Sequence, residues 1–229
     1  MSGTDRVETG RQEGFDRASA DLPEVVLFRR SRIATGSAGF DWSSRCLMRA
    51  EYPSSPSQEI LDRQAWAGPT LANGVLTSEL AEFCQSGISV VLGSRDSYGQ
   101  PLVGRGLACR INADGIVRII YREQQNIALQ RAIENGAPIA ATFTKPFSHR
   151  SIQLKASGAR TVRVVVQDGA AAFAQTRAFH QELVDVGHTE QFAAGYTRFE
   201  PHELAALEFL PEAAFVQTPG PNAGSVLTP

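Results

Sequence analysis

The chain has 229 residues, which suits one domain with an extension, because domains usually hold about 100–200 residues. Hydrophobic residues make up 42% and charged residues 20%, values that exclude the disordered and membrane classes. The formal net charge is -2 and no run of like charges occurs, so no nucleic-acid partner is expected. Apolar runs such as residues 88–92 are far shorter than the roughly 20 residues that cross a bilayer, so no membrane partner is expected either.

The cysteine spacing and the first residues of the chain indicate the cellular compartment of the protein. Cys46, Cys84 and Cys109 show no CxxC spacing, and no apolar run of signal-peptide length follows Met1. We therefore expect a cytoplasmic protein without disulfides.

The first part of the chain differs in composition from the rest. Residues 2–22 mix Gly, Ser, Asp, Glu and Arg without an apolar period, which is typical of a disordered tail. A short strand is expected at residues 24–28, and the segment through residues 52–56 has the Ser and Pro content of a linker. We interpret residues 1–74 as a disordered or loosely packed extension and residues 75–229 as the folded domain.

Regular structure becomes readable at Leu76. Leu80, Phe83 and Cys84 follow it at i+4, i+7 and i+8, so the four side chains lie on one face of a helix. Further helices are expected at residues 123–134, 168–186 and 189–196.

Strands are expected where short apolar or alternating runs lie between turn residues. They fall at residues 88–94, 102–111, 116–121, 139–143, 150–155, 161–167 and 205–209. Short strands joined by tight turns, with a helix between the third and the fourth, indicate a mainly β, antiparallel barrel with helical insertions. A doubly wound parallel sheet would need alternating strand and helix units, which the pattern lacks. The Pro- and Gly-bearing segment 217–221 is expected to end the ordered structure.

Sequence motifs of common catalytic sites are missing. The glycines fit neither a G-x-S-x-G nor a Walker spacing, and no H-x-E or H-E-x-x-H metal signature occurs. The four histidines are too dispersed to predict a metal site and are interpreted as surface or capping residues: His149, His180, His188 and His202.

Polar side chains lie inside strands that are otherwise apolar. Arg105 and Arg110 flank small residues in the second strand, where Gly104 and Gly106 indicate a bulge or a close approach by a ligand or by another backbone segment. Arginines on adjacent strands could bind a phosphate bidentately. The alternative, with equal weight, is that these arginines are exposed on the outer face of a half-solvated sheet.

The fifth strand alternates in the same way. Ser151, Gln153 and Lys155 fall on one face, whereas Arg150 falls on the other.

The order of elements and several short motifs over residues 76–167 resemble the pyridoxamine 5'-phosphate oxidase-like, FMN-binding split-barrel family. The family's flavin-contacting R-x-x-x-x-K run corresponds to Arg105, Gly106, Leu107, Ala108, Cys109 and Arg110. Its Tyr-Thr pair falls on Ile120 and Tyr121, and its Arg-Gln pair falls on Arg150 and Ser151. The resemblance implies an antiparallel split β-barrel that binds FMN at the interface of a homodimer.

The resemblance also implies roles for single residues. Arg105, Arg110 and Arg122 would hold phosphate or ribityl oxygens, Tyr121 and Ser151 would form hydrogen bonds, and Arg150 or Gln153 would approach the flavin ring. The family's Ser-Arg-Lys phosphate site corresponds to residues 122–125, where Arg122 is the only cation. The Arg-Leu-His-Asp-Arg ending of true pyridoxamine phosphate oxidases is replaced by residues 215–221, so synthesis of pyridoxal phosphate is not expected.

These features predict an FMN-dependent oxidoreductase that acts on a small organic substrate, with the flavin supplying the hydride or electron chemistry. Two alternatives stay open. The same barrel can bind haem, with His149 as a possible axial ligand, or it can serve as a dimeric scaffold without a cofactor.

Overall fold

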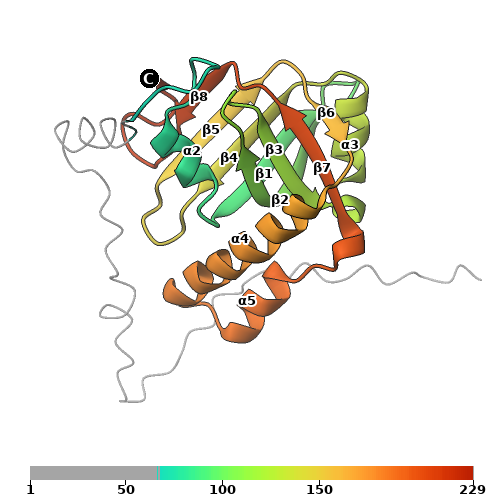
Figure 1. Cartoon of the computed structure of the whole chain (residues 1–229), viewed down its shortest axis with the longest axis vertical. Helices are drawn as coiled ribbons and strands as arrows, with labels where there is room; N and C mark the ends of the chain where they lie inside the picture. Colours follow the sequence, from blue (N-terminus) through green and yellow to red (C-terminus); the bar gives the residue numbers. More distant parts are fainter. Residues whose placement is uncertain (1–65, 67, 229) are drawn as a thin grey trace, which may run out of the picture. The chain divides into compact units, whose positions relative to one another are not determined.

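The computed structural model describes Trp66 and residues 68–228 (Figure 1). The strand expected at residues 24–28, the linker at residues 52–56 and Cys46 lie outside the described residues. Among the described residues, no helix has both the length and the apolar composition needed to span a membrane.

The described strands form one sheet in which all neighbouring strands are antiparallel. The strands are β1 Ser89–Arg95, β2 Pro101–Ile111, β3 Val117–Arg122, β4 Ile139–Thr144, β5 Ser151–Ala156, β6 Arg160–Val162, β7 Leu204–Phe209, β8 Ala213–Val216 and β9 Val226–Leu227. Their order across the sheet is β6-β7-β3-β2-β1-β4-β5-β8-β9. The expected mainly β, antiparallel fold with helical insertions is confirmed.

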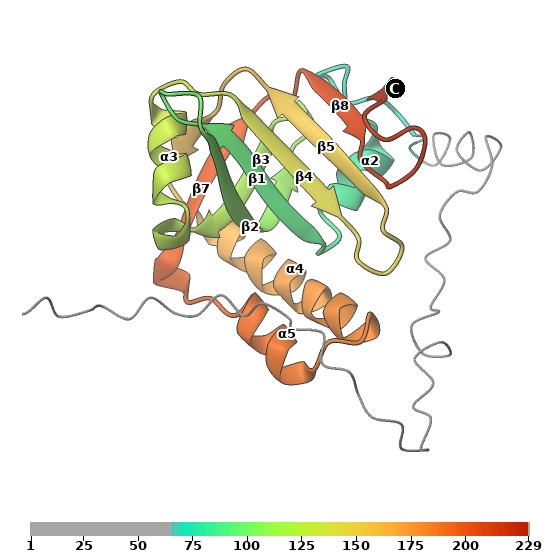
Figure 2. The ribbon, with the colours of Figure 1, turned by 180° about the vertical axis from the view of Figure 1, so that it is seen from behind.

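The inner face of the sheet surrounds the main hydrophobic core. Alternating side chains of distant strands meet in one buried cluster, among them Val90 of β1, Ile119 of β3, Phe143 of β4, Leu154 of β5 and Leu207 of β7. Strands far apart in the sheet can share one core only if the sheet curls, and Figures 1 and 2 show this curvature. The sheet is therefore built as a split barrel.

Four described helices accompany the barrel: α2 Ser78–Cys84, α3 Ile127–Glu134, α4 Val166–Asp185 and α5 Glu190–Thr197. Leu80 and Cys84 of α2 enter the main core, as their helical spacing predicts. α4 and α5 pack together, and α4 lies against the outer face of β2 (Figure 1). The sheet is thus covered on part of its outer face by the α4–α5 pair.

Three expected boundaries are wrong. The helix expected at residues 123–134 begins as a 3-10 turn, Glu123–Gln125, and becomes α-helical only at Ile127. The strand expected at residues 161–167 ends at Val162, because the carboxylate of Asp168 accepts a hydrogen bond from the Val165 backbone N–H at 2.9 Å and starts α4 there. Ordered structure also continues past residues 217–221, because this segment turns and pairs β9 with β8.

The domain begins earlier than residue 75. Trp66 is 8% exposed and packs edge-to-face on Phe83, with ring centroids 4.8 Å apart. Thr70 forms a β-bridge with Thr77, and Leu71 packs against the main core. The end of the expected extension is therefore part of the folded domain. A single tryptophan ahead of the helix gives no periodic signal, which explains why the sequence pattern missed it.

Candidate functional site

Arg105 occupies the outer face of β2, opposite Val91 of β1. Its guanidinium group lies over the Tyr196 ring of α5, 3.7 Å from the ring centroid, and its Nη2 donates a hydrogen bond to the Tyr196 carbonyl oxygen. Stacking on an aromatic ring holds the guanidinium in one orientation. The charge of Arg105 is thus held at the junction between the sheet and α5.

A buried amide joins Arg105 to Arg122. The Asn126 side chain is 2% exposed, and its Oδ1 accepts a hydrogen bond from the Arg105 backbone N–H at 2.9 Å. Its Nδ2 donates to the backbone carbonyl oxygens of Arg105 at 3.2 Å and of Arg122 at 2.8 Å. A Cβ atom at Gly104 would lie 2.2 Å from Asn126 Oδ1, so glycine is needed there. Asn126 therefore holds the backbones of both arginines, which we call the arginine pair.

The arginine pair carries two like charges that influence each other. Partial burial lowers the pKa of Arg105, Tyr196 opposes this shift, and the charge of Arg122 adds to it. Neither arginine forms an ion pair with any residue that the structure describes. The Arg122 Nε instead donates a hydrogen bond to Gln125 Oε1 at 3.1 Å. An anionic ligand would offset the repulsion between the two guanidinium groups.

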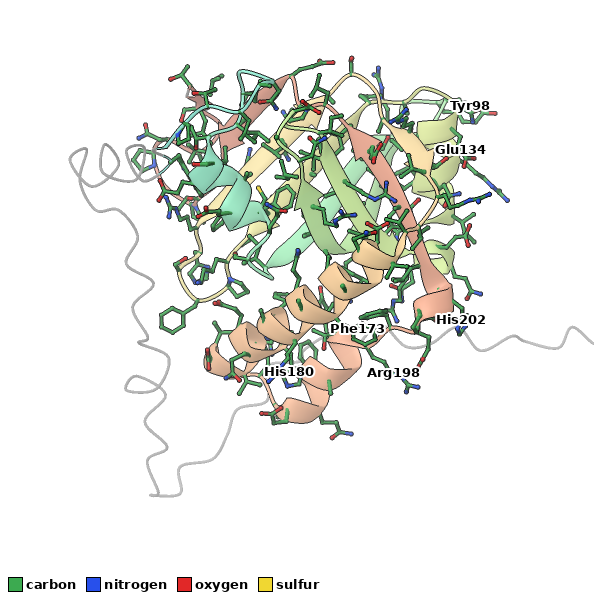
Figure 3. The ribbon with its side chains drawn as sticks, in the orientation of Figure 1. Tyr98, Glu134, Phe173, His180, Arg198 and His202 are labelled. Atoms are coloured by element: carbon green, nitrogen blue, oxygen red, sulfur yellow. The ribbon has the colours of Figure 1, made fainter. Side chains whose placement is uncertain are left out.

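A pocket of about 690 Å³ adjoins the arginine pair through Tyr196. It lies between the β4–β5 loop, the second half of α4, and α5, and its volume is in the range of small-molecule sites. We call it the aromatic pocket after the side chains that dominate its wall: Phe147, His149, Phe179, His188, Phe192 and Tyr196. The α4 and α5 walls are joined by His180, whose Nε2 lies 2.6 Å from Glu190 Oε2 (Figure 3).

Ser151 and Gln153 lie on the same outer face as Arg105, as the alternation of the fifth strand predicts. The Ser151 hydroxyl is 2.7 Å from the Thr144 hydroxyl, and Gln153 Nε2 donates to Thr142 Oγ1 at 2.9 Å. Gln153 and Thr142 thus lie in register with Arg105, but Val91 of β1 lies between Thr142 and Arg105.

Arg110 and Arg150 lie apart from the arginine pair. Arg110 Nη1 donates to Asp168 Oδ1 at 2.7 Å at the start of α4. The Arg150 guanidinium lies over the Trp66 ring, 3.8 Å from its centroid, beside Phe83 of α2. Both side chains therefore connect the sheet to segments that pack on it.

Three further residues of the expected flavin-contacting set face the core: Gly106, Cys109 and Tyr121. A Cβ atom at Gly106 would lie 2.8 Å from Val90 Cγ1, so the glycine reflects a close approach inside the barrel. The Tyr121 hydroxyl donates to Gln130 Oε1 at 3.2 Å, and burial raises its pKa to about 12. Tyr121 is therefore a neutral residue of the core.

The last three residues of that set lie beneath α4. Leu107, Ala108 and Ile120 are buried in a small cluster with Ala172 of α4. The register of β2 against β3 shifts between Gly106 and Ala108, which confirms the bulge predicted from the glycines.

Sequence reasoning missed Asn126 and the aromatic pocket. Asn126 falls inside the segment expected to be helical, and only the glycine at position 104 hinted that another group approaches the strand. His188, Phe192 and Tyr196 recur at i, i+4 and i+8, a spacing that was readable. Nothing in the sequence indicated that the β4–β5 loop faces them.

No family model and no curated protein matches the chain. Among solved structures, HupZ of Group A Streptococcus is 19% identical with a TM-score of 0.41, over 66% of this chain and 100% of that one. A Lactobacillus delbrueckii protein provisionally assigned as a pyridoxamine 5'-phosphate oxidase is 18% identical with a TM-score of 0.39, over 62% and 94%. The heme storage protein HutZ of Vibrio cholerae is 16% identical with a TM-score of 0.36, over 62% and 94%. No role of any residue follows from similarities at this level.

Proposed function

We propose that the chain is an FMN-binding flavoprotein with oxidoreductase activity on a small organic substrate. The arginine pair carries this proposal, since a phosphate requires closely placed donors that are not already neutralised by carboxylates. The sequence resemblance over residues 76–167 supports FMN among the cofactors that bear a phosphate.

In this proposal the chain binds and orients the cofactor, and FMN supplies the hydride or electron chemistry. Arg105 and Arg122 hold the phosphate, and the Tyr196 ring covers one face of the Arg105 guanidinium. Ser151 and Gln153 supply hydrogen bonds from the same face of the sheet. Asn126 acts as a positioning residue, because it contacts the backbone of both arginines.

FMN affinity should depend on the arginine pair. Arg105→Ala and Arg122→Ala each remove charge-assisted hydrogen bonds, worth about 1.5–3 kcal/mol, so each should weaken FMN binding about ten- to hundredfold. Quenching of flavin fluorescence during titration of the apo-protein measures this. The control is Arg177→Ala on α4, because Arg177, like the arginine pair, forms no ion pair with a described residue, and because it is exposed and does not contact Asn126. Equal weakening by all three substitutions would rule out a specific phosphate site at the arginine pair.

The absorption spectrum of the purified protein separates the candidate cofactors. Two flavin bands support the proposal, whereas a single intense Soret band would replace it with haem binding. His149 lines the aromatic pocket and is the residue to replace in that case. A colourless protein that takes up neither FMN nor haemin favours the scaffold without a cofactor.

We also propose that the protein is a homodimer. The outer face of β1, β4 and β5 is not covered by any described helix (Figure 2), and Val91 of β1 and Val103 of the neighbouring β2 are 41% and 76% exposed. A two-fold partner would cover this face by using the same surface twice. Sedimentation velocity at micromolar concentration should give twice the mass of the chain. A monomer in the presence of bound FMN would contradict this arrangement.

A further inference from the structure

The aromatic pocket has flat walls from three separate segments. Phe147 comes from the β4–β5 loop, Phe179 from α4, and Phe192 from α5. The His188 and Phe192 rings are stacked with centroids 4.6 Å apart, and the Phe192 and Tyr196 rings are stacked at 5.7 Å. Both stacks lie within one wall, and the Phe179 ring of α4 meets the Tyr196 ring edge-to-face with centroids 5.8 Å apart. The lining therefore offers ring faces and ring edges, both of which pack well against a flat aromatic ligand.

The loop that closes one side of the pocket is held in place by α4. Glu182 accepts a hydrogen bond from the Phe147 backbone N–H at 3.3 Å, and its other carboxylate oxygen lies 3.3 Å from Lys145 Nζ. His149, on the same loop, has a φ of 55°, a value that is uncommon outside glycine. Backbone strain of this kind is found at binding sites more often than elsewhere. Glu182 therefore fixes the loop at Lys145 and Phe147.

The charge of the pocket wall disfavours an anion. Among the described residues, neither an arginine nor a lysine lines it, whereas the carboxyl group of Asp185 does. The nearby Lys145 is already paired with Glu182. Aromatic faces carry negative potential, so they attract cations and repel anions. This wall contrasts with the arginine pair, which does not line the pocket although the Arg105 guanidinium lies over the Tyr196 ring.

We propose that the aromatic pocket binds a planar aromatic molecule that carries no negative charge. This molecule can be the substrate only if the proposed flavin function holds. Its binding to the aromatic pocket does not depend on that function. The pocket volume of about 690 Å³ accommodates a fused ring system of two or more rings.

Three naphthalene probes that differ in one substituent test the charge preference by calorimetric titration of the full chain. The neutral 2-naphthalenemethanol and the cationic 2-naphthylmethylamine should bind, and the anionic 2-naphthoate should bind at least about tenfold more weakly, because its carboxylate loses water without gaining a cation. Equal or tighter binding of 2-naphthoate, or no binding of any probe, would overturn the proposal.

Variants locate the probes in the pocket. Phe192→Ala and Phe147→Ala each remove an aromatic wall, at side chains 47% and 51% exposed, so both variants should fold. Each should weaken 2-naphthalenemethanol about three- to tenfold. Tyr98→Ala is the matched control, since Tyr98 is 88% exposed in the β1–β2 turn, away from the pocket (Figure 3). Unchanged affinity in both phenylalanine variants would place the probe elsewhere and refute the assignment.

Arg122→Ala separates this proposal from the flavin function. Arg122 does not line the pocket, so its loss should weaken FMN and leave the affinity for 2-naphthalenemethanol unchanged. If wild-type protein binds the neutral probe but not FMN, the flavin function fails and the pocket stands. If it binds FMN but none of the probes, the pocket fails and the flavin function stands.

Discussion

Asp168→Ala should lower the free energy of unfolding by about 3–5 kcal/mol, the usual effect of removing one partner of a buried ion pair. The Asp168 side chain is completely buried and accepts hydrogen bonds from Arg118 Nη2 at 2.6 Å and Arg110 Nη1 at 2.7 Å. It also accepts one from the Val165 backbone N–H at 2.9 Å. Its loss leaves Arg118, which is 13% exposed, with Glu208 as its remaining carboxylate partner, takes from Arg110 its ion pair among the described residues, and removes the cap of α4. Thermal melts of both proteins measure the difference.

Because of the Asp168 carboxylate, the stability of the fold should decrease as the pH is lowered into the acid range. Burial by itself would raise the pKa of Asp168, but hydrogen bonds from Arg118, Val165 and Arg110 outweigh it and hold the pKa below its ordinary value of 3.8. A group whose pKa is lower in the folded state stabilises the fold above its unfolded pKa, and this contribution is lost as the pH falls through the folded value. The melting temperature should therefore drop below about pH 4, and it should drop less in Asp168→Asn.

Asp114→Ala is the control for Asp168→Ala, because Asp114 is exposed in the β2–β3 turn, where Asn112 Nδ2 donates to it at 3.3 Å. It should change stability by less than about 0.5 kcal/mol. Equal melting temperatures for Asp168→Ala and the wild type would show that Arg110 and Arg118 gain nothing from this carboxylate.

Trp66→Ala should also lower the free energy of unfolding by about 3–5 kcal/mol, the range for replacing a buried tryptophan by alanine. The indole fills space beside Phe83, and its face supports the Arg150 guanidinium at 3.8 Å. Both the hydrophobic burial and the cation–π contact are lost in the variant. Chemical denaturation followed by far-UV circular dichroism measures the change.

Two deletions extend this test to the boundary of the domain. Removal of residues 1–70 deletes Trp66 and should destabilise the domain by a similar amount, whereas removal of residues 1–65 keeps the indole in place. Phe173→Ala controls for loss of an aromatic side chain, because Phe173 of α4 is 59% exposed (Figure 3). Equal melting temperatures for the two deletions would show that the domain does not depend on Trp66.

Local periodicity and turn chemistry determined most of the elements of this fold. The helical spacing from Leu76 to Cys84 predicted α2, and the Asp-Gly pair at residues 114–115 marked the turn between β2 and β3, where Gly115 has a φ of 79°. The alternation of β5 placed Ser151 and Gln153 on one face, and the structure shows that this is the face of Arg105. Such features depend on residues close together in the chain, so the sequence alone reveals them.

Only the tertiary structure decided which partner each charged side chain has. Alternation assigns Arg110 to a face of a strand, but the segment covering that face comes from far along the chain, and it carries Asp168. The arginine pair likewise depends on Asn126, which contacts β2 across a sequence separation of 21 residues. The aromatic pocket combines the β4–β5 loop, α4 and α5 in the same way. These sites depend on how separate elements pack, and that packing follows from burial of the common core rather than from any local pattern.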